Sequence, residues 1–450
     1  MTTIYAQSTA LGRAAIGIIR ISGPKCVDAV SSLTPNLRNF PSHQAKLANL
    51  YGPQGLLDQA LVIYFEQSRS YTGEPLVELH CHGSPPVLTA VMQALAAAGC
   101  RHAEPGEFTK RAFYNNKLDL TKVEGIRDLL NAETELQRQV AIAGASGHLA
   151  QLYTDWRAAI VHNSALLTAL IDFSDDNEID GNIISTVSKN IAHLNHLVTT
   201  HVTKIRKSEI ISSGIRLVIL GQPNAGKSSL LNRLVNRAAS IVSPVAGTTR
   251  DLINVNLDIG GYKLTVGDTA GIRTIHSTSE HDSLEQIGIN IALEAARAAD
   301  LILAVMPMDE PRSQLVLAEL ESIGAPFIKV GNKADKVAGT ELSSSPFDVH
   351  VSCKTGEGLD ELVKLISAKC GEISPLSSDC VGASQRTREL LENSVIPGLS
   401  ASLEMLDRED VIRASAELQL AADGISKITG NNVGVNEILG VVFGTFCIGK

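Results

Sequence analysis

A glycine-rich stretch near the middle of the chain limits the possible folds more than any other feature. Residues 221–228 read GQPNAGKS and fit the pattern G-x-x-x-x-G-K-[ST] of phosphate-binding loops. A β-rich run at 216–220 precedes the loop, and a helix-like run at 229–235 follows it. Backbone N–H groups of such a loop surround phosphate oxygens, and the N-terminus of the following helix adds positive dipole. The stretch therefore predicts an α/β nucleotide-binding domain, with a chance turn as the alternative.

Three further motifs follow in the order that a nucleotide-hydrolysing domain requires, and they remove the chance alternative. Residues 247–251 read GTTRD and supply a switch threonine. Residues 268–271 read DTAG after a strand expected at 263–266. Residues 332–335 read NKAD after an apolar strand expected at 327–330. Together they predict a Ras-like P-loop G domain over residues 213–375.

Each motif has a defined role at the phosphates. Lys227 neutralises the β and γ phosphates, and the hydroxyls of Ser228 and Thr249 bind Mg²⁺. Asp268 holds the metal through its ligand shell, and the N–H of Gly271 meets the γ-phosphate. The motif residues expected at the nucleotide are Asn224, Ala225, Gly226, Lys227, Ser228, Ser229, Thr249, Asp268, Thr269, Ala270, Gly271, Asn332, Lys333, Ala334, Asp335, Ser352, Cys353 and Lys354.

The last motif identifies the base. Guanine presents an N1–H and an exocyclic amine side by side, and the carboxylate of Asp335 can accept from both, while Lys333 can lie over the ring. Adenine offers no such pair, so the carboxylate would be left unpaired and ATP rejected. The run 352–354, Ser-Cys-Lys, fits the loop that closes over the guanine carbonyl. The sequence therefore predicts GTP as the ligand.

The motifs leave open which group orients the attacking water. In Ras-type enzymes a glutamine directly after the DTAG motif does this, but here the position is Ile272. Glu285 is the acid that we favour to position the water, with Glu280 and Asp282 as competitors. All three can equally be solvated loop charges.

Asn224 in the phosphate loop is a candidate ligand of a monovalent cation. Its amide oxygen can help to hold a positive charge beside the phosphates, in the place of an arginine finger. The alternative is an ordinary loop asparagine that bonds its own backbone.

The chain's length and texture predict several domains. At 450 residues it exceeds what one core usually serves. Residues 1–118 mix short apolar runs with Gly/Pro turns and one expected helix at 87–98, which indicates a small α+β domain. Residues 119–212 and 376–450 have helical periodicity, and the G domain interrupts them. One helix face is predicted from Val187, Ile191, Leu194, Val198, Val202 and Ile205. The fold class is thus α/β multidomain, with an all-helical domain that carries an inserted G domain.

Composition excludes some classes of protein. A formal net charge of −9 argues against coating nucleic acid through bulk positive charge, although local contact with RNA stays open. The seven cysteines are scattered without a C-x-x-C pair, which suits free thiols in a reducing compartment. We find no apolar run long enough to span a bilayer and no signal peptide, so we expect a cytoplasmic protein without a membrane span.

Several segments carry a resemblance to a known family. They are GIIRISG at 17–23, TGE at 72–74, PGEFTKRAF at 105–113, KLDL at 117–120, the four G motifs and the terminal FCIGK at 446–450. Over essentially its whole length the chain is similar to the bacterial tRNA-modification GTPases MnmE (TrmE).

The resemblance implies a reaction and its partners. Members work as homodimers with an FAD-dependent MnmG-type partner, in a heterotetramer or larger complex. That complex adds a (carboxymethyl)aminomethyl group to carbon 5 of the wobble uridine of certain tRNAs. The one-carbon donor is a tetrahydrofolate derivative, 5-formyl or methylene, bound by the N-terminal domain at 1–118, which also dimerises. Arg20, Glu78, Lys117 and Lys450 match the folate pocket, and the tail places Cys447 beside it as a candidate catalytic residue.

The resemblance also implies how hydrolysis is activated. Asn224, Ser243, Val245 and Thr248 match K⁺-binding positions, and K⁺ supports pairing of two G domains. Glu285 matches the catalytic glutamate. The segment 272–284 (IRTIHSTSEHDSL) is about three residues longer than the family pattern, so the alignment can slip to Asp282.

Three remaining features can be explained either by a structural role or by a functional one. Cys447 fits a buried small hydrophobe better than a lipidation signal. His80 and His82 share one face of an expected strand and can bind metal, but no further ligand is in view. The basic cluster of Lys110, Arg111 and Lys117 can touch tRNA phosphate or form a solvated helix face.

Two other functions compete with tRNA modification. A ribosome-assembly GTPase would carry an RNA-binding module after the G domain, whereas only helices are expected there. A dynamin-like membrane remodeller would carry a basic amphipathic helix, whereas the helices here are acidic to neutral.

Overall fold

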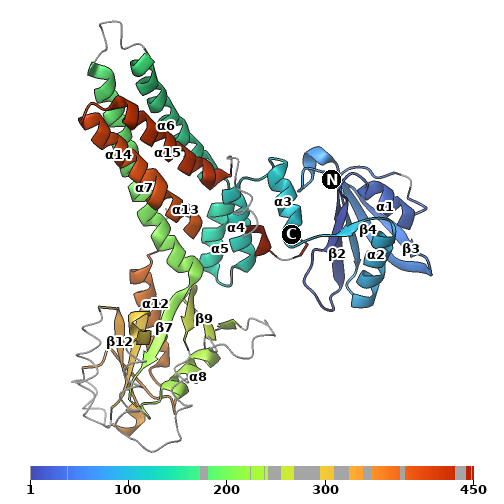
Figure 1. Cartoon of the computed structure of the whole chain (residues 1–450). Coiled ribbons are helices and arrows are strands. Elements are labelled where there is room, and N and C mark those ends of the chain that lie inside the picture. Colours follow the sequence, from blue (N-terminus) through green and yellow to red (C-terminus); the bar gives the residue numbers. More distant parts are fainter. Residues whose placement is uncertain are drawn as a thin grey trace, which may run out of the picture. The chain divides into compact units, whose positions relative to one another are not determined.

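The computed structural model forms two compact units (Figure 1). It describes residues 2–37, 39–172, 181–222, 224–237, 239–241, 255–267, 294–308, 324–337, 346–375, 381–430, 442–446 and 448–449. The first unit comprises residues 1–127, 145–195 and 389–450, and the second comprises 128–144 and 196–388. The division between the units therefore passes through four helices: α4 (Leu120–Asn131), α5 (Glu135–Ala145), α7 (Gly181–Ser213) and α13 (Gln385–Leu390).

A six-stranded sheet organises the N-terminal part of the first unit. Its strands stand in the order β3-β4-β5-β2-β1-β6, and only the β1–β6 pair is parallel. The strands are β1 (Ile4–Gln7), β2 (Ile16–Ser22), β3 (Ala45–Gly52), β4 (Gly55–Phe65), β5 (Leu76–His82) and β6 (Arg101–His102). A short 3₁₀ turn, η1 (Gln67–Arg69), connects β4 to the loop before β5.

The period of two in these strands gives the sheet two different faces. Ile19, Leu79 and Val62 point to one face, where α1 (Cys26–Leu33) and α2 (Pro85–Ala97) cover a hydrophobic core. The alternate residues face the other side, where α3 (Glu107–Tyr114) places Phe108 against Ile4. Polar side chains on β2 and β5 therefore share one face of the sheet, away from the main core.

Long helices follow, and their buried faces match the predicted period. All six residues that the sequence assigned to one helix face are buried in α7: Val187, Ile191, Leu194, Val198, Val202 and Ile205. The other helices are α4, α5 (Glu135–Ala145), α6 (His148–Asp172), α13 (Gln385–Leu390), a π-helical turn (Leu391–Val395), α14 (Ile396–Asp407) and α15 (Val411–Thr429). The π-turn leads into Pro397, which has no N–H to donate and whose ring is poorly tolerated in a regular helix interior.

The second unit is built on a seven-stranded sheet in the order β13-β12-β11-β7-β10-β9-β8. The first five strands are parallel, and β9 and β8 continue antiparallel. They are β7 (Ile215–Leu220), β8 (Ala239–Ile241), β9 (Val255–Ile259), β10 (Tyr262–Val266), β11 (Leu301–Pro307), β12 (Phe327–Asn332) and β13 (Val349–Val351). The five parallel strands present their carboxyl ends at one edge of the sheet.

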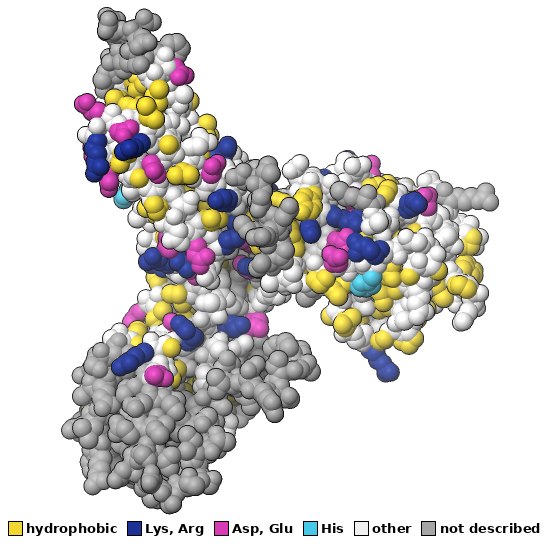
Figure 2. Space-filling model, in the orientation of Figure 1, with side chains coloured by type: hydrophobic (Ala, Val, Ile, Leu, Met, Phe, Trp, Pro, Cys, Tyr) yellow, Lys and Arg dark blue, Asp and Glu magenta, His cyan; other side chains and the backbone are white. Residues whose placement is uncertain are grey.

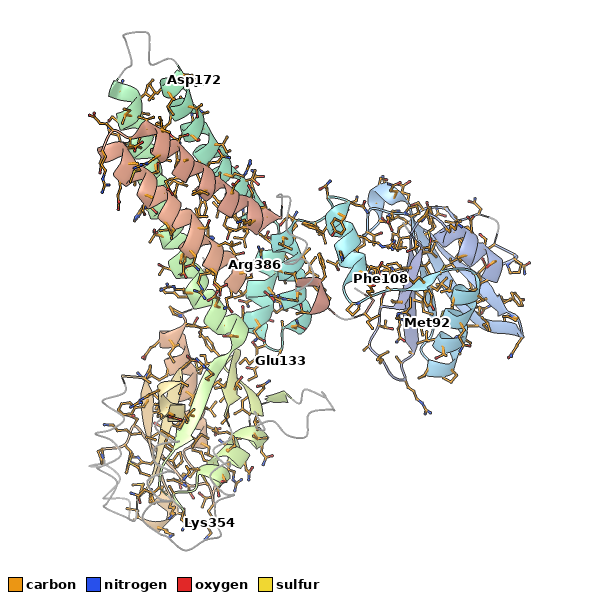
Figure 3. The ribbon with its side chains drawn as sticks, viewed as in Figure 1. Met92, Phe108, Glu133, Asp172, Lys354 and Arg386 are labelled. Atoms are coloured by element: carbon orange, nitrogen blue, oxygen red, sulfur yellow. The ribbon has the colours of Figure 1, made fainter. Side chains whose placement is uncertain are left out.

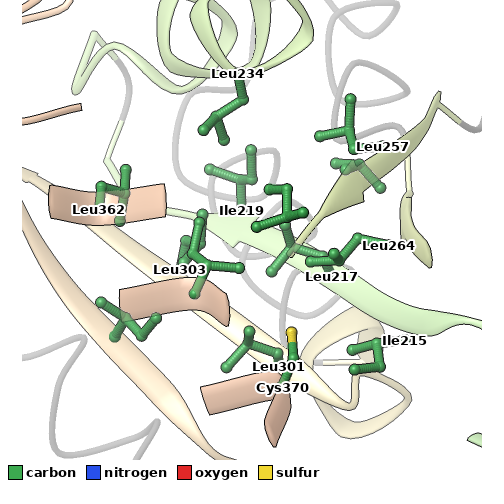
Figure 4. Packing of buried hydrophobic residues seen from close by; sticks show 14 of the residues in the cluster. Ile215, Leu217, Ile219, Leu234, Leu257, Leu264, Leu301, Leu303, Leu362 and Cys370 are labelled. Carbon is green, nitrogen blue, oxygen red and sulfur yellow. The ribbon is translucent and has the colours of Figure 1, made fainter. Parts of the chain in front are cut away.

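The core of this unit lies between the sheet and its helices (Figure 4). Strand residues such as Leu217, Leu264 and Leu303 pack against Leu234 of α8 (Lys227–Arg237) and Leu362 of α12 (Leu359–Ile373). Leu136 and Val140 of α5 join the same cluster, and Lys263 of β10 pairs with Glu133 at 2.6 Å. Helix α5 and the residues just before it are therefore packed onto the G-domain sheet.

The predicted fold class is confirmed: an α+β N-terminal part, helices, and a parallel-sheet G domain inserted between them. The predicted domain limits at 118, 212 and 375 stay predictions. Among the helices that the structure describes, none is both long and apolar enough to cross a membrane.

Candidate functional site

The phosphate loop leaves β7 at the carboxyl edge of the sheet and runs into α8. Gly221 has a φ of 154°, and a Cβ there would collide with the carbonyl oxygen of Val305. Gly226 has a φ of 95°, and a Cβ there would collide with the side-chain amide of Asn332. Both motif glycines are thus required by conformation and by close approach. Asn224, between them, is also left-handed, with a φ of 62°.

Lys227 begins α8 and turns its ammonium back over the loop. Its Nζ donates to the carbonyl oxygen of Gly221 at 2.7 Å and to that of Gln222 at 2.9 Å. The positive charge therefore lies at the concave side of the loop, together with the N-terminus of α8. Ser228 and Ser229 follow on the first turn of that helix.

Asn332 connects the phosphate loop to the base-recognition loops. It ends β12, is 2% exposed, and donates through Nδ2 to the carbonyl oxygen of Ala225 at 2.7 Å. Its Oδ1 accepts from the N–H of Cys353 at 3.4 Å. One buried amide thus holds segments from both ends of the predicted nucleotide site.

Asp335 and Ser352 form the centre of the predicted base site. The buried Ser352 hydroxyl donates to Oδ1 of Asp335 at 2.7 Å, and its oxygen accepts from the N–H of Thr355 at 3.1 Å. The Ser352 hydrogen bond, together with the nearby charges of Lys354 and Lys336, lowers the pKa of Asp335. The carboxyl is therefore ionised at neutral pH and can act as an acceptor. Lys333, two residues before, is left-handed, with a φ of 65°.

Cys353 and Lys354 continue this loop, and sequence reasoning missed the residue that holds it. Arg233 of α8 donates to the carbonyl oxygens of Cys353 and Lys354 at 2.8 and 2.9 Å. Lys354 lies at the end of the unit away from Glu133 (Figure 3). Burial raises the pKa of the Cys353 thiol, despite the nearby Arg233 charge, so this cysteine stays a thiol at neutral pH. The only signal of Arg233 in the sequence is a basic residue five positions after the motif.

Strand β10, which precedes the predicted DTAG motif in the sequence, ends at the same edge. Strand β10 pairs in parallel with β7, with Val266 opposite Leu217, so the chain leaves β10 at the carboxyl edge. Several predicted site residues lie outside the described residues, and their roles stay predictions: Ser243, Val245, Thr248, Thr249, Asp268, Thr269, Ala270, Gly271, Glu280, Asp282, Glu285, Cys447 and Lys450.

A charged cluster occupies the second face of the N-terminal sheet. Arg20 of β2 stands opposite Glu78 of β5, and its Nε and Nη2 donate to Oε1 of Glu78 at 3.1 and 2.9 Å. Oε2 of Glu78 lies 3.3 Å from Nε2 of His80. The strand register thus brings two of the predicted folate residues into direct contact.

Aromatic rings and a lysine extend this cluster. The Arg20 guanidinium lies 5.3 Å from the ring centre of Tyr71 and 5.8 Å from that of Phe108, which Figure 3 labels on α3. Lys117 donates to the carbonyl oxygen of Ser68, in the segment that carries Tyr71. The C-terminal tail lies against the end of β1, where Ser8 donates to the carbonyl oxygen of Gly449 at 3.0 Å.

Two groups of side chains for which the sequence left alternatives open have polar partners in the structure. Nδ1 of His82 lies 2.7 Å from Oδ1 of Asp58, while His80 faces Glu78, and no metal-ligand cluster occurs among the described residues. The interpretation of Arg111 as part of an exposed basic cluster is wrong. Arg111 is 7% exposed, pairs with Glu74 at 2.8 Å and Glu107 at 3.0 Å, and donates to the carbonyl oxygen of Thr2, so its guanidinium is engaged within the domain.

Comparisons with known proteins agree with this architecture. The family model "GTP-binding protein TrmE N-terminus" matches residues 3–117, and "MnmE helical domain" matches residues 120–447. The chain is 40% identical to tRNA modification GTPase MnmE of Parvibaculum lavamentivorans, over 100% of both chains. It is 39% identical to mitochondrial tRNA modification GTPase MSS1 of Saccharomyces cerevisiae, over 100% of this chain and 93% of the relative.

A vertebrate relative is equally similar. The mitochondrial 5-taurinomethyluridine-[tRNA] synthase subunit GTPB3 of Danio rerio is 39% identical, over 100% of this chain and 93% of its own. Full-length identity at this level and two adjoining family models confirm the resemblance predicted from the motifs. The chain belongs to the MnmE (TrmE) family of tRNA-modification GTPases.

Proposed function

We propose that this chain hydrolyses GTP to drive modification of carbon 5 of the wobble uridine in tRNA. The observation that carries the proposal is the joined site at the carboxyl edge of the G-domain sheet. Lys227 lies over the phosphate loop, Asp335 is set by Ser352, and Asn332 bridges the two. This arrangement supports a ligand with phosphates at one end and guanine at the other.

The residues of this site have separate tasks. The carboxylate of Asp335 accepts from the N1–H and the amine of guanine. Lys227 and the loop N–H groups neutralise the phosphate oxygens and hold the γ-phosphate in line for attack. The Ser228 hydroxyl is a hard oxygen ligand that suits Mg²⁺, with Thr249 as its proposed second protein ligand; the ion would neutralise charge on the phosphates.

The cluster around Arg20 supports a tetrahydrofolate derivative as the second ligand. Folate combines a flat polar ring with a carboxylate tail, and the cluster combines Tyr71, a carboxylate at Glu78 and cations at Arg20 and Lys117. In our proposal Arg20 and Lys117 hold the tail, Glu78 orients the ring, and Lys450 completes the pocket. The folate would supply the one-carbon unit.

An apolar surface beside this cluster supports a homodimer. Leu47 of β3 stands opposite Leu61 of β4, which stands opposite His80 of β5. Leu47 is 63% exposed and Leu61 42% exposed. Hydrophobic side chains gather over the N-terminal domain in Figure 2. Exposed leucines in adjacent strands mark a surface that a second copy can bury.

K⁺ is proposed as the activating cation, with Asn224, Ser243, Val245 and Thr248 as ligands. The left-handed Asn224 lies between the two motif glycines of the phosphate loop, where an amide oxygen can reach a cation beside the phosphates. Replacing K⁺ by Na⁺ should therefore slow hydrolysis sharply, because the smaller ion leaves these oxygens too far apart. Phosphate release would be measured in matched KCl and NaCl, with GTP affinity as the control. Equal rates of hydrolysis in both salts would contradict the proposed K⁺ site.

The whole function is tested in the host cell. Deletion of the gene should abolish the (carboxymethyl)aminomethyl-type wobble uridine, measured by mass spectrometry of tRNA nucleosides. The intact gene should restore it, and a Lys227→Ala copy should not, since the phosphates lose their central cation. Lys364→Ala, an exposed lysine on α12, is the matched control and should restore it fully. An unchanged nucleoside profile after deletion would contradict the proposal and favour the alternative function, that of a ribosome-assembly GTPase.

The modification chemistry requires other components. We propose an FAD-dependent MnmG-type partner, which membership of the MnmE family implies, while the cluster around Arg20 holds the one-carbon donor. The cytosol, where tRNA is charged and used, is the proposed compartment.

A further inference from the structure

Arg233 on α8 is placed to act on guanine recognition from outside the motifs. Its Nε and Nη2 donate to two successive carbonyl oxygens, those of Cys353 and Lys354, at 2.8 and 2.9 Å. A guanidinium presents its donors in a rigid planar fork, so it can hold two neighbouring peptide groups in one orientation. Helix α8 begins at Lys227, so one helix carries both the phosphate lysine and this fork.

The fork is the first member of a chain of hydrogen bonds that ends at Asp335. The carbonyl of Lys354 belongs to the same peptide group as the N–H of Thr355. That N–H donates to Oγ of Ser352 at 3.1 Å, and the Ser352 hydroxyl donates to Oδ1 of Asp335 at 2.7 Å. Hydrogen bonds in series polarise one another. The positive charge of Arg233, which donates to the Lys354 carbonyl, therefore strengthens the bonds from Thr355 to Ser352 and from Ser352 to Asp335.

The same loop is fixed from its other side. Asn332 accepts from the N–H of Cys353, and Ser352 is tied within the loop through its N–H to Glu357 and its carbonyl to Gly356. Without Arg233, the carbonyls of Cys353 and Lys354 would lose a charged donor, while the Asn332 contact would remain. Removal of Arg233 should therefore loosen the loop without dismantling it.

We propose that Arg233 is a positioning residue for guanine recognition, which holds residues 352–354 and thereby orients the Asp335 carboxylate toward the base. The inference rests on the proposed base site. In this proposal Arg233 slows the dissociation of guanine nucleotides and increases the preference of the site for guanine over other purines. Arg233 itself touches neither base nor phosphate in this role.

The experiment compares GDP with inosine diphosphate, which lacks only the exocyclic amine from which the Asp335 carboxylate should accept a hydrogen bond. Arg233→Ala should speed GDP dissociation about tenfold, the effect of losing one good hydrogen bond to a charged group. It should also narrow the ratio of GDP to inosine diphosphate affinity, and raise KM for GTP more than it lowers kcat. Arg233→Lys should restore part of the effect, because an ammonium can reach one of the two carbonyls.

Arg237→Ala is the matched control on the same helix. Arg237 pairs with the Asp360 side chain and not with the loop, so its loss should leave the affinity ratio unchanged. A wild-type ratio and dissociation rate in Arg233→Ala, with or without a lower melting temperature, would overturn the proposal. Failure of the base site itself is distinguishable, because then Asp335→Asn would leave guanine selectivity intact.

Discussion

Replacing Asp335 by asparagine should turn this protein from a guanine-nucleotide binder into one that prefers xanthine nucleotides. The carboxylate accepts from two neighbouring N–H groups of guanine, whereas an amide presents one donor and one acceptor. Xanthine carries an oxygen in place of the exocyclic amine, and the new amide N–H can donate to it. With guanine, the same N–H would face the amine and leave two donors unpaired.

The expected size of this change follows from the geometry of Asp335. Ser352 already engages Oδ1 at 2.7 Å and lowers the pKa of the carboxyl, so the group is held in one orientation as an ion. A site built to pair a polar group rejects a mismatched analogue by about a thousandfold or more. We therefore expect GTP affinity to fall by about that factor, and xanthosine triphosphate to bind better than GTP.

Equilibrium binding of fluorescent GDP and xanthosine diphosphate would measure the exchange. Asp360→Asn on α12 is the control, because the exposed Asp360 side chain pairs with Arg237 and not with Ser352 or Asp335. Its selectivity should match that of the unaltered chain. Retention of guanine preference by the Asp335 variant would refute the assignment of the base.

The motifs of the nucleotide site could be predicted because their chemistry dictates both residue type and spacing. A loop that turns around phosphates needs glycine where Gly226 approaches Asn332, and a guanine carboxylate needs its place after a buried strand. The helical period of α7 likewise reports which side chains are buried. These features depend on neighbours in sequence.

Other features depend on contacts between distant segments and were not predictable. Arg233 meets Cys353 across 120 positions, so its role follows only from where α8 lies beside the loop. The pairing of Arg20 with Glu78 follows from the register of β2 and β5, which the sequence does not state. Arg111 looked like part of a basic surface because its partner Glu74 lies 37 positions away.

Replacing Glu285 by alanine should leave GTP binding intact and stop turnover. The position after the DTAG motif is Ile272, which cannot orient water, so another group must do so. The chain enters this segment from β10 at the carboxyl edge, beside the phosphate loop, since Val266 pairs with Leu217. A positioned carboxylate contributes about a hundredfold or more to such a step, and kcat should fall by that factor.

Single-turnover hydrolysis and GTP affinity, measured on the same preparations, would separate chemistry from binding. Glu280→Ala and Asp282→Ala are the matched variants, and both should keep turnover near the unaltered rate. Full activity in Glu285→Ala would contradict the assignment. Loss of activity in Asp282→Ala instead would mean that the longer segment 272–284 moves the acid by three positions.

The glutamine variant then shows what the carboxylate does. Glu285→Gln keeps an oxygen and an N–H that can orient water through hydrogen bonds, but it cannot accept a proton at neutral pH. Turnover close to that of the unaltered chain would mean that orientation is sufficient. Turnover as low as in Glu285→Ala would mean that the negative charge itself is required. We expect an intermediate rate, because hydrolysis through a loose transition state depends on water position more than on early proton removal.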